Sequence, residues 1–376
     1  MAQRSEHVLD SGRLGNLIEA LACQGYEVLG PTVRDGAIIY DLVGSAGDLP
    51  AGWTDEQEPA RYHLKRRKDE LLFGYAVGPQ SWKRYTHPAE VRLWSAEREG
   101  ATFRILNDEK PERQRAFLGV RACELAAIAV QDRVLREDKY HDPIYERHRG
   151  GAFIIAVQCT EAAGTCFCAS MGTGPRVSGG YDLVLTELLG SRGHRFLAAA
   201  GSNRGAAILT KLQTVPATEE DRQEAAAKVD AAARQQVRSI DTTGIKELLY
   251  ENFEHPRWDN VASRCLTCAN CTMVCPTCFC TSVEDVTDIS GSHAERWRRW
   301  DSCFTQSFSY IHGGSVRTSA KARYRQWMTH KLASWIDQFG SSGCVGCGRC
   351  ITWCPAGIDI TEEVRAIREG GRDGNP

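Results

Sequence analysis

The chain has 376 residues, with 46 Lys and Arg against 48 Asp and Glu, and it contains sixteen cysteines. Its length predicts two or three domains, and its hydrophobic fraction of 42% excludes wholesale disorder. A formal charge of -2 gives no long-range attraction for nucleic acid, and the sequence has neither a transmembrane run of about 18 apolar residues nor an apolar N-terminal secretion signal. We therefore expect a cytoplasmic protein whose cysteines are thiolate ligands of metals or clusters rather than disulfides.

The first part of the chain predicts a layered α/β domain. Apolar residues at helical spacing over 14–24 predict a helix, and the extended runs over 26–30 and 37–43 predict strands. Further short apolar strands then alternate with helical segments, the predicted elements being 114–120, 121–135, 151–159, 182–189 and 194–201. Such alternation is typical of a sheet covered by helices.

A connecting helix is predicted over residues 217–238, which are rich in Ala, Glu, Gln and Arg. Thr218 precedes three acidic residues, as at the N-terminus of a helix. We place the domain boundary just after this helix. The prediction is an α/β domain over 1–240 and a second domain over 241–376, which holds eleven of the sixteen cysteines.

Two cysteine runs in the second part share the spacing C-x2-C-x2-C-x3-C-P, one ending at Pro276 and the other at Pro355. A 4Fe-4S cluster takes four thiolates, and in two-cluster proteins the fourth Cys of each run binds the other cluster. We assign cluster one to Cys265, Cys268, Cys271 and Cys354, and cluster two to Cys344, Cys347, Cys350 and Cys275. Two zinc sites are the alternative, but zinc gives no reason for this spacing to occur twice.

The 68 residues between the two runs predict helices over 293–312 and 321–339. This insert favours an α-helical ferredoxin-like domain that carries both 4Fe-4S clusters. After the second run, Asp359 and Glu362 predict a capping box that opens a last helix. The fold class is therefore an α/β domain followed by an α-helical ferredoxin-like domain.

The insert also contains a basic, aromatic stretch between His293 and Lys331. Its charged members are Arg296, Arg298, Arg299, Arg317, Lys321, Arg323, Arg325 and Lys331, and three tryptophans lie among them. Three interpretations stay open: the cations offset the negative charge of the clusters, the stretch docks a partner, or it is a solvated helix face. Single-stranded nucleic acid is disfavoured by the negative net charge.

Eight cysteines lie outside the predicted dicluster ligands. Cys123, Cys159, Cys166 and Cys168 follow two predicted strands, and neighbouring strands would bring their thiols to one edge of the sheet. The sequence thus predicts a possible third 4Fe-4S cluster there, with ordinary core packing as the alternative. Cys278, Cys280 and Cys303 are candidates for another metal, for sulfur contacts near cluster two, or for core packing, and Cys23 is predicted to pack on the first helix.

Motifs for catalytic chemistry are missing from the sequence. No P-loop, G-x-S-x-G or H-E-x-x-H motif occurs, and no G-x-G-x-x-G follows a predicted strand. The chain therefore predicts an electron carrier with no catalytic residues of its own.

Five motifs give a more specific resemblance, namely FLGVRACELAAIAVQD, TCFCASMGTGP, CANCTMVCPTCFC, RWDSCFTQSFS and GCVGCGRCITWCP. With them the chain resembles the iron–sulfur β subunit of cytoplasmic, sulfhydrogenase-type nickel–iron hydrogenases, and it is similar to the 4Fe-4S dicluster subunit of anaerobic sulfite reductases. The resemblance covers residues 10 to 365 or so.

The resemblance implies an electron relay between two partners. One would be a flavoprotein subunit that binds NAD(P)H, and the other a nickel–iron hydrogenase module of small and large subunits. FAD would lie on the flavoprotein and not on this chain. The alternatives are the same relay in a sulfite, polysulfide or heterodisulfide reductase, a reductase subunit whose α/β domain binds a flavin or substrate, and a zinc-binding interaction protein.

Overall fold

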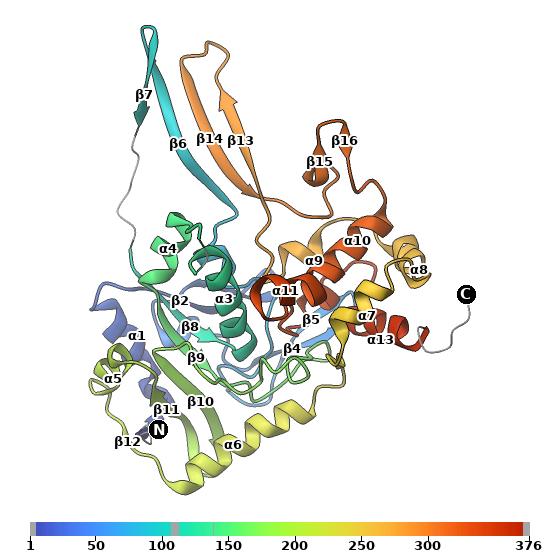
Figure 1. Cartoon of the computed structure of the whole chain (residues 1–376). Helices are drawn as coiled ribbons and strands as arrows, with labels where there is room; N and C mark the ends of the chain where they lie inside the picture. Colours follow the sequence, from blue (N-terminus) through green and yellow to red (C-terminus); the bar gives the residue numbers. More distant parts are fainter. Residues whose placement is uncertain (1–4, 107–112, 138, 371–376) are drawn as a thin grey trace.

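The computed structural model describes residues 5–106, 113–137 and 139–370, and an eight-stranded mixed sheet forms one half of it (Figure 1). The strand order is β12-β1-β11-β10-β9-β8-β2-β3. The strands are β1 (Glu6–Asp10), β2 (Glu27–Arg34), β3 (Ala37–Leu42), β8 (Arg115–Val120), β9 (Phe153–Val157), β10 (Leu183–Gly190), β11 (Gly193–Ala200) and β12 (Val215–Pro216). Parallel pairing joins β2, β8, β9 and β10, and antiparallel strands flank them on both sides.

Helices cover both faces of this sheet, which explains why its central strands are almost entirely apolar. Alternate residues of β8 and β9 pack into two different cores. One core takes in α1 (Leu14–Ala22) and α5 (Asn203–Leu209), and the other takes in α3 (Ala122–Leu135). The short helices α2 (Lys83–Thr86) and α4 (Pro143–Gly150) and the hairpin of β4 (Trp53–Glu58) and β5 (Arg61–Arg66) complete this part.

The first helix differs from the sequence prediction at its end. Leu14, Leu17, Ile18 and Leu21 form its buried stripe, but the helix stops at Ala22. Cys23 is the C-cap residue and is exposed. The prediction that Cys23 packs on the helix is therefore wrong, because the stripe ends two residues earlier.

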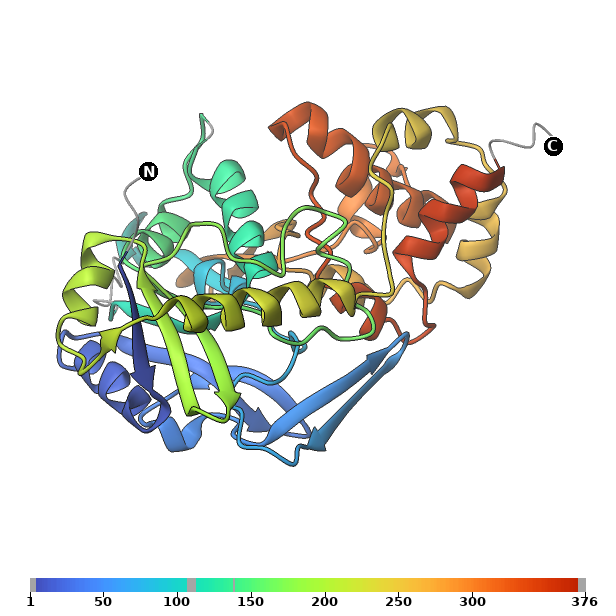
Figure 2. The ribbon, with the colours of Figure 1, turned by 90° about the horizontal axis from the view of Figure 1, so that it is seen from below.

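The connecting helix α6 (Glu219–Arg234) runs from the sheet toward the cysteine-rich half (Figure 2). Thr218 caps it as predicted, since its hydroxyl accepts the backbone N–H of Asp221 at 3.2 Å. The mostly alanine stripe is buried at Ala225, Val229 and Ala232.

A second sheet of four strands combines segments from both sides of residue 240. It consists of β13 (Thr281–Thr287), β14 (His293–Trp300), β6 (Glu90–Glu99) and β7 (Thr102–Leu106), in that order, and it projects from the body as two hairpins (Figure 1). The predicted helix over 293–312 is therefore wrong. Residues 293–300 pair with β6, some 200 positions earlier, and no local pattern reveals that partner.

The cysteine-rich half is mainly helical around one apolar core. Its helices are α7 (Ile245–Glu251), α8 (Arg257–Arg264), α9 (Asn270–Met273), α10 (Ala320–Thr329), a π-helical turn (His330–Ser334), α11 (Trp335–Phe339), α12 (Arg349–Thr352) and α13 (Ile360–Gly370), with a small hairpin of β15 (Tyr310–Ile311) and β16 (Gly314–Ser315). The predicted helix over 321–339 is present, with a π turn inside it. The core contains Trp258, Met328, Leu332 and Ile351.

The domain boundary near residue 240 stays a prediction. None of the helices within the described ranges combines the length and the apolar character that crossing a membrane requires.

Candidate metal centres

The first cysteine run wraps a cavity at the end of α8. The chain leaves that helix at Cys265 and turns sharply, with Thr267 and Ala269 at positive φ values of 51° and 66°. Such a conformation is costly for residues with a side chain, and strained turns concentrate at functional sites. It directs the loop around the cavity before α9 begins at Asn270.

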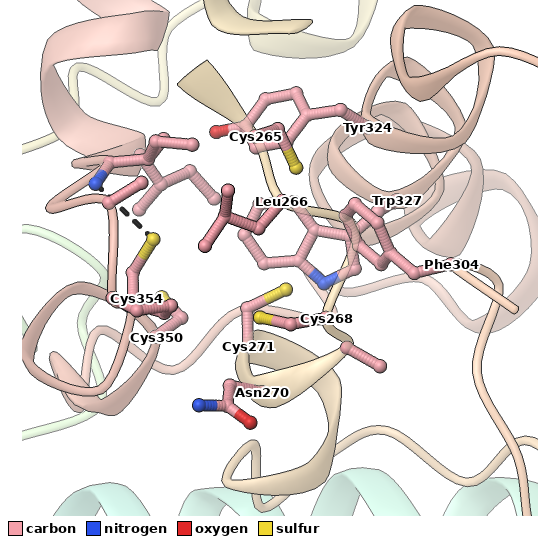
Figure 3. Close-up of a pocket in the computed structure, with 15 residues that line it drawn as sticks. Cys265, Leu266, Cys268, Asn270, Cys271, Phe304, Tyr324, Trp327, Cys350 and Cys354 are labelled. Carbon is pink, nitrogen blue, oxygen red and sulfur yellow. Dashed lines mark hydrogen bonds between the residues drawn. The ribbon is translucent and has the colours of Figure 1, made fainter.

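Four predicted ligands of cluster one line this cavity. They are Cys265, Cys268, Cys271 and Cys354, and Figure 3 shows their sulfur atoms around one space. Backbone amides donate to two of them, from Thr267 to Cys265 Sγ and from Ile358 to Cys354 Sγ, both at 3.4 Å. The remaining wall is apolar and includes Phe304, Tyr324 and Trp327.

The second run and the last cysteine of the first run line a second cavity. Its cysteines are Cys275, Cys344, Cys347 and Cys350, the four predicted for cluster two. Cys350 also lines the first cavity, so the two cavities are neighbours. The fourth cysteine of each run thus lies in the cavity formed by the other run.

Burial makes several of these thiols poor acids in the free chain. Cys275 is an exception, because a hydrogen bond with Cys278 and the charge of Lys331 lower its pKa. Burial raises the pKa of Cys344 to about 12, and it raises the pKa of Cys271 well above its usual range, where nearby thiols add to the effect. Four thiolates around a dry cavity are stable only with a cationic group between them. The cavities therefore fit an iron–sulfur cluster, whose irons compensate that charge.

A single metal ion fits this arrangement less well. In the described part of the chain, no group of three or more His, Cys, Asp or Glu side chains is arranged to hold one ion. Sulfur atoms that surround a cavity, rather than converging on a point, match a group with several metal corners.

The cysteines predicted for a third cluster come together next to the second cavity. Cys123 lies in the first turn of α3, Cys159 follows β9, and Cys166 and Cys168 lie in the loop beyond it. The strands β8 and β9 are adjacent and parallel, which is the condition under which the sequence would bring these thiols together. Burial, together with the nearby Cys159 and Cys347, raises the pKa of Cys168 to about 12.

Two glycines allow the loop over 165–168 to contact the second cysteine run. Gly346 and Gly348 have φ values of 64° and 77°, and a Cβ on them would lie 2.7 Å from Cys168 Cα and 2.4 Å from the Thr165 carbonyl oxygen. The Phe167 N–H donates to the Gly346 carbonyl at 2.9 Å. Because glycine has no Cβ, these two positions allow the backbone of the loop to lie directly against the second run.

A buried ion pair, which the sequence did not indicate, connects the same two regions. Arg349, between two cysteines of the second run, pairs with Glu124, which follows Cys123, and both side chains are at most 1% exposed. Tyr40 and Trp82 also donate to the Glu124 carboxylate, at 2.9 and 3.1 Å. The only sequence signal is that both charged residues lie inside cysteine motifs.

The basic stretch is largely neutralised by carboxylates from elsewhere. Ion pairs join Arg296 to Asp285, Arg298 to Asp142, Arg299 to Glu90 and Glu284, Lys321 to Asp259, and Arg325 to Glu254. These residues are therefore not a concentration of unpaired positive charge. Lys331 differs, because it lines the second cavity.

Lys331 and the remaining cysteines lie beside the second cavity. The Lys331 ammonium is 3.2 Å from Cys275 Sγ and 3.7 Å from Cys278 Sγ. Burial, together with the nearby Cys280 thiol, raises the pKa of Cys303 to about 12. A metal role for Cys278, Cys280 and Cys303 stays a prediction.

Two neighbouring cavities lined by paired cysteine runs define an iron–sulfur protein that transfers electrons. The family described as "4Fe-4S dicluster domain" matches residues 264–358. The chain is 33% identical over 277 residues to sulfhydrogenase 2 subunit beta of Pyrococcus furiosus, an alignment that covers 72% of this chain and 80% of that protein. The chain therefore belongs to the family of sulfhydrogenase β subunits. No solved structure matches it.

Proposed function

We propose that this chain relays electrons between an NAD(P)H-binding flavoprotein and a nickel–iron hydrogenase module. The observation that carries the proposal is Cys350, which lines both cysteine cavities and so makes them immediate neighbours. Single electrons pass efficiently only between centres that are close together. The name of the Pyrococcus furiosus relative supports the hydrogenase as the enzyme served.

The ligand sets are those that the spacing predicts. Cluster one is held by Cys265, Cys268, Cys271 and Cys354, and cluster two by Cys344, Cys347, Cys350 and Cys275. A bound 4Fe-4S cluster supplies reversible one-electron transfer. The protein holds the sulfur ligands in fixed loops, excludes water with the aromatic wall of cavity one, and places the Lys331 charge beside cavity two.

A third cluster on Cys123, Cys159, Cys166 and Cys168 would extend the relay into the α/β part. Three contacts support this extension: the thiols affect one another electrostatically, their loop packs on the second run, and Gln236 Nε2 donates to Cys168 Sγ at 3.2 Å. Along the path of the electrons, the order of the centres would then be the third cluster, cluster two and cluster one.

We further propose an α-helical ferredoxin type of arrangement for the dicluster part, with FAD on a partner and a cytoplasmic location for the complex. Cys278, Cys280 and Cys303 belong to the surroundings of cluster two in this proposal, because Cys278 shares the Lys331 contact with Cys275.

Iron and acid-labile sulfide analysis of the anaerobically purified chain tests the cofactors. About eight irons per chain support two clusters, and about twelve support the third. Zinc without sulfide would contradict the proposal. A flavin spectrum from the isolated chain would favour a flavin-binding reductase subunit.

The partner proposal is tested by what purifies with the chain from its native source. Nickel together with flavin in the complex is the expected result. Siroheme in place of nickel would indicate that the enzyme served is a sulfite reductase. It would not change the assignment of the cluster ligands.

A further inference from the structure

Lys331 is placed at the second cavity by an irregularity in its helix. The residues from His330 to Ser334 form a π-helical turn between α10 and α11. Such turns add a residue to the helical repeat, change the direction of the side chains, and occur frequently at functional sites. Lys331 is 6% exposed, although lysine is almost never fully buried without a partner.

The contacts of Lys331 are sulfur and oxygen acceptors. Its ammonium donates to Cys275 Sγ at 3.2 Å, to Thr277 Oγ1 at 3.0 Å and to the Gly343 carbonyl at 3.3 Å. No ion pair with a carboxylate is present at Lys331 in the described ranges, and the largest electrostatic effects on its ammonium come from Cys275, Cys278 and Cys344. Two of these three cysteines are proposed ligands of cluster two.

A buried ammonium without a carboxylate needs another source of negative charge. A cluster held by four thiolates supplies that charge, and it becomes more negative when it takes up an electron. A cation and a hydrogen bond at a ligand sulfur both favour the reduced form, so they raise the reduction potential.

Lys83 provides an internal comparison, because it is a second buried lysine near the same cysteines. Its ammonium donates to the carbonyl oxygens of Met273 and Cys278, at 3.4 and 3.1 Å, and lies 3.8 Å from the centre of the Trp300 ring. No sulfur atom is among its hydrogen-bond acceptors in the described part of the structure. Of these two lysines, Lys331 is the one that donates to a proposed ligand sulfur.

We propose that Lys331 is a positioning residue that raises the reduction potential of cluster two through its hydrogen bond to Cys275 Sγ. The inference rests on the proposed ligand set of cluster two. The higher potential favours cluster two over cluster one as the location of an electron that the two clusters share.

The test is a potentiometric titration of the full chain, followed by electron paramagnetic resonance, with iron and sulfide measured in every preparation. The cluster two signal is the one absent from Cys344→Ser. In Lys331→Met we expect full iron content. The equilibrium distribution of an electron between the clusters should change about tenfold toward cluster one, which corresponds to a decrease of about 59 mV in the reduction potential of cluster two. Lys331→Arg should restore most of the difference, and Lys83→Met should change it less.

Two results would overturn the proposal. One is an unchanged cluster two potential in Lys331→Met with full iron, and the other is an equal shift in Lys83→Met. If Lys331→Met does not assemble cluster two, the potentials of Lys331→Gln and Lys331→Arg are compared instead, because Gln lacks the charge that Arg keeps. Loss of cluster two from all three variants would show that Lys331 has a purely structural role. Wild-type protein with too little iron for two clusters would instead contradict the proposed function.

Discussion

The two cysteine cavities have the same ligand spacing but different surroundings. In the first, Cys268 is exposed, the sulfur atoms accept backbone N–H groups, and Phe304, Tyr324 and Trp327 form the wall. In the second, Cys275, Cys344 and Cys347 are all buried. It is enclosed by the loop over 165–168 and by Lys331.

We infer from this difference that the cysteine spacing specifies the type of cluster, while the residues packed around each cavity tune its reduction potential. Burial, charge and hydrogen bonds at sulfur set the potential of a cluster. We therefore expect cluster two to be an interior centre that holds an electron more tightly, and cluster one to exchange electrons with a partner at the surface.

The largest expected effect comes from removing the crossed ligands. Cys354→Ser, a change in the second run, should abolish the signal of the cluster on Cys265–Cys271 and leave the other. Cys275→Ser should do the reverse, because each cavity takes its fourth cysteine from the other run. Electron paramagnetic resonance and iron analysis would show a loss of about four irons per chain in each case.

Cys23→Ser is the matched control, since Cys23 is exposed at the end of α1 and should not alter iron content. If Cys354→Ser removed only the cluster on Cys344–Cys350, the assignment of one crossed ligand to each cavity would be wrong.

A chelator should remove iron from the two clusters at different rates. Under anaerobic conditions, we expect about half of the dicluster iron to leave in a fast phase, because a cluster with an exposed ligand is accessible to the chelator. The slow phase should belong to cluster two, whose Cys275, Cys344 and Cys347 are buried. Iron release followed by absorbance, with resonance spectra at intervals, checks the order. A single phase for both clusters would remove the distinction.

Breaking the ion pair behind cavity two should destabilise the fold. Glu124→Ala leaves the Arg349 guanidinium buried without its carboxylate, and such losses lower the free energy of unfolding by about 3–5 kcal/mol. Denaturant unfolding of the cluster-loaded chain measures it. Asp285→Ala breaks the exposed pair with Arg296 and should have no measurable effect. Equal stability of the two variants would mean that water reaches Arg349.

The smallest effect concerns His87, which stacks beside Trp300 and does not line either cavity. Burial, helped by Arg298, lowers the pKa of His87 to about 4, below its usual 6.5. Between those values the unfolded chain binds a proton that the folded chain does not, so stability falls as pH falls from 6.5 to 4, by about 3 kcal/mol.

Unfolding free energies of wild type and His87→Phe at a series of pH values test this, because phenylalanine keeps a ring beside Trp300 and does not titrate. The difference between the two proteins should change only between pH 6.5 and 4. A difference independent of pH would show that the pKa of His87 is the same in the folded and in the unfolded chain.

The sequence predicted the sheet strands well, because buried parallel strands are continuous apolar runs such as Phe153–Val157. It failed at His293–Trp300, where alternating arginine and tryptophan fit either a helix or a strand. The arginines there are neutralised by Asp285, Asp142 and Glu90. These partners are distant in sequence, so the stretch looked far more basic than it is.

By itself the sequence determined the family and its 4Fe-4S character, and it predicted the eight dicluster ligands, because ligand spacing is a local property of the chain. Only the tertiary structure decided what surrounds each cavity. Lys331 contacts Cys275 across 56 positions and Arg349 pairs with Glu124 across 225. Contacts between such distant residues arise from packing, which also decides which of two identical motifs is buried beside a charge.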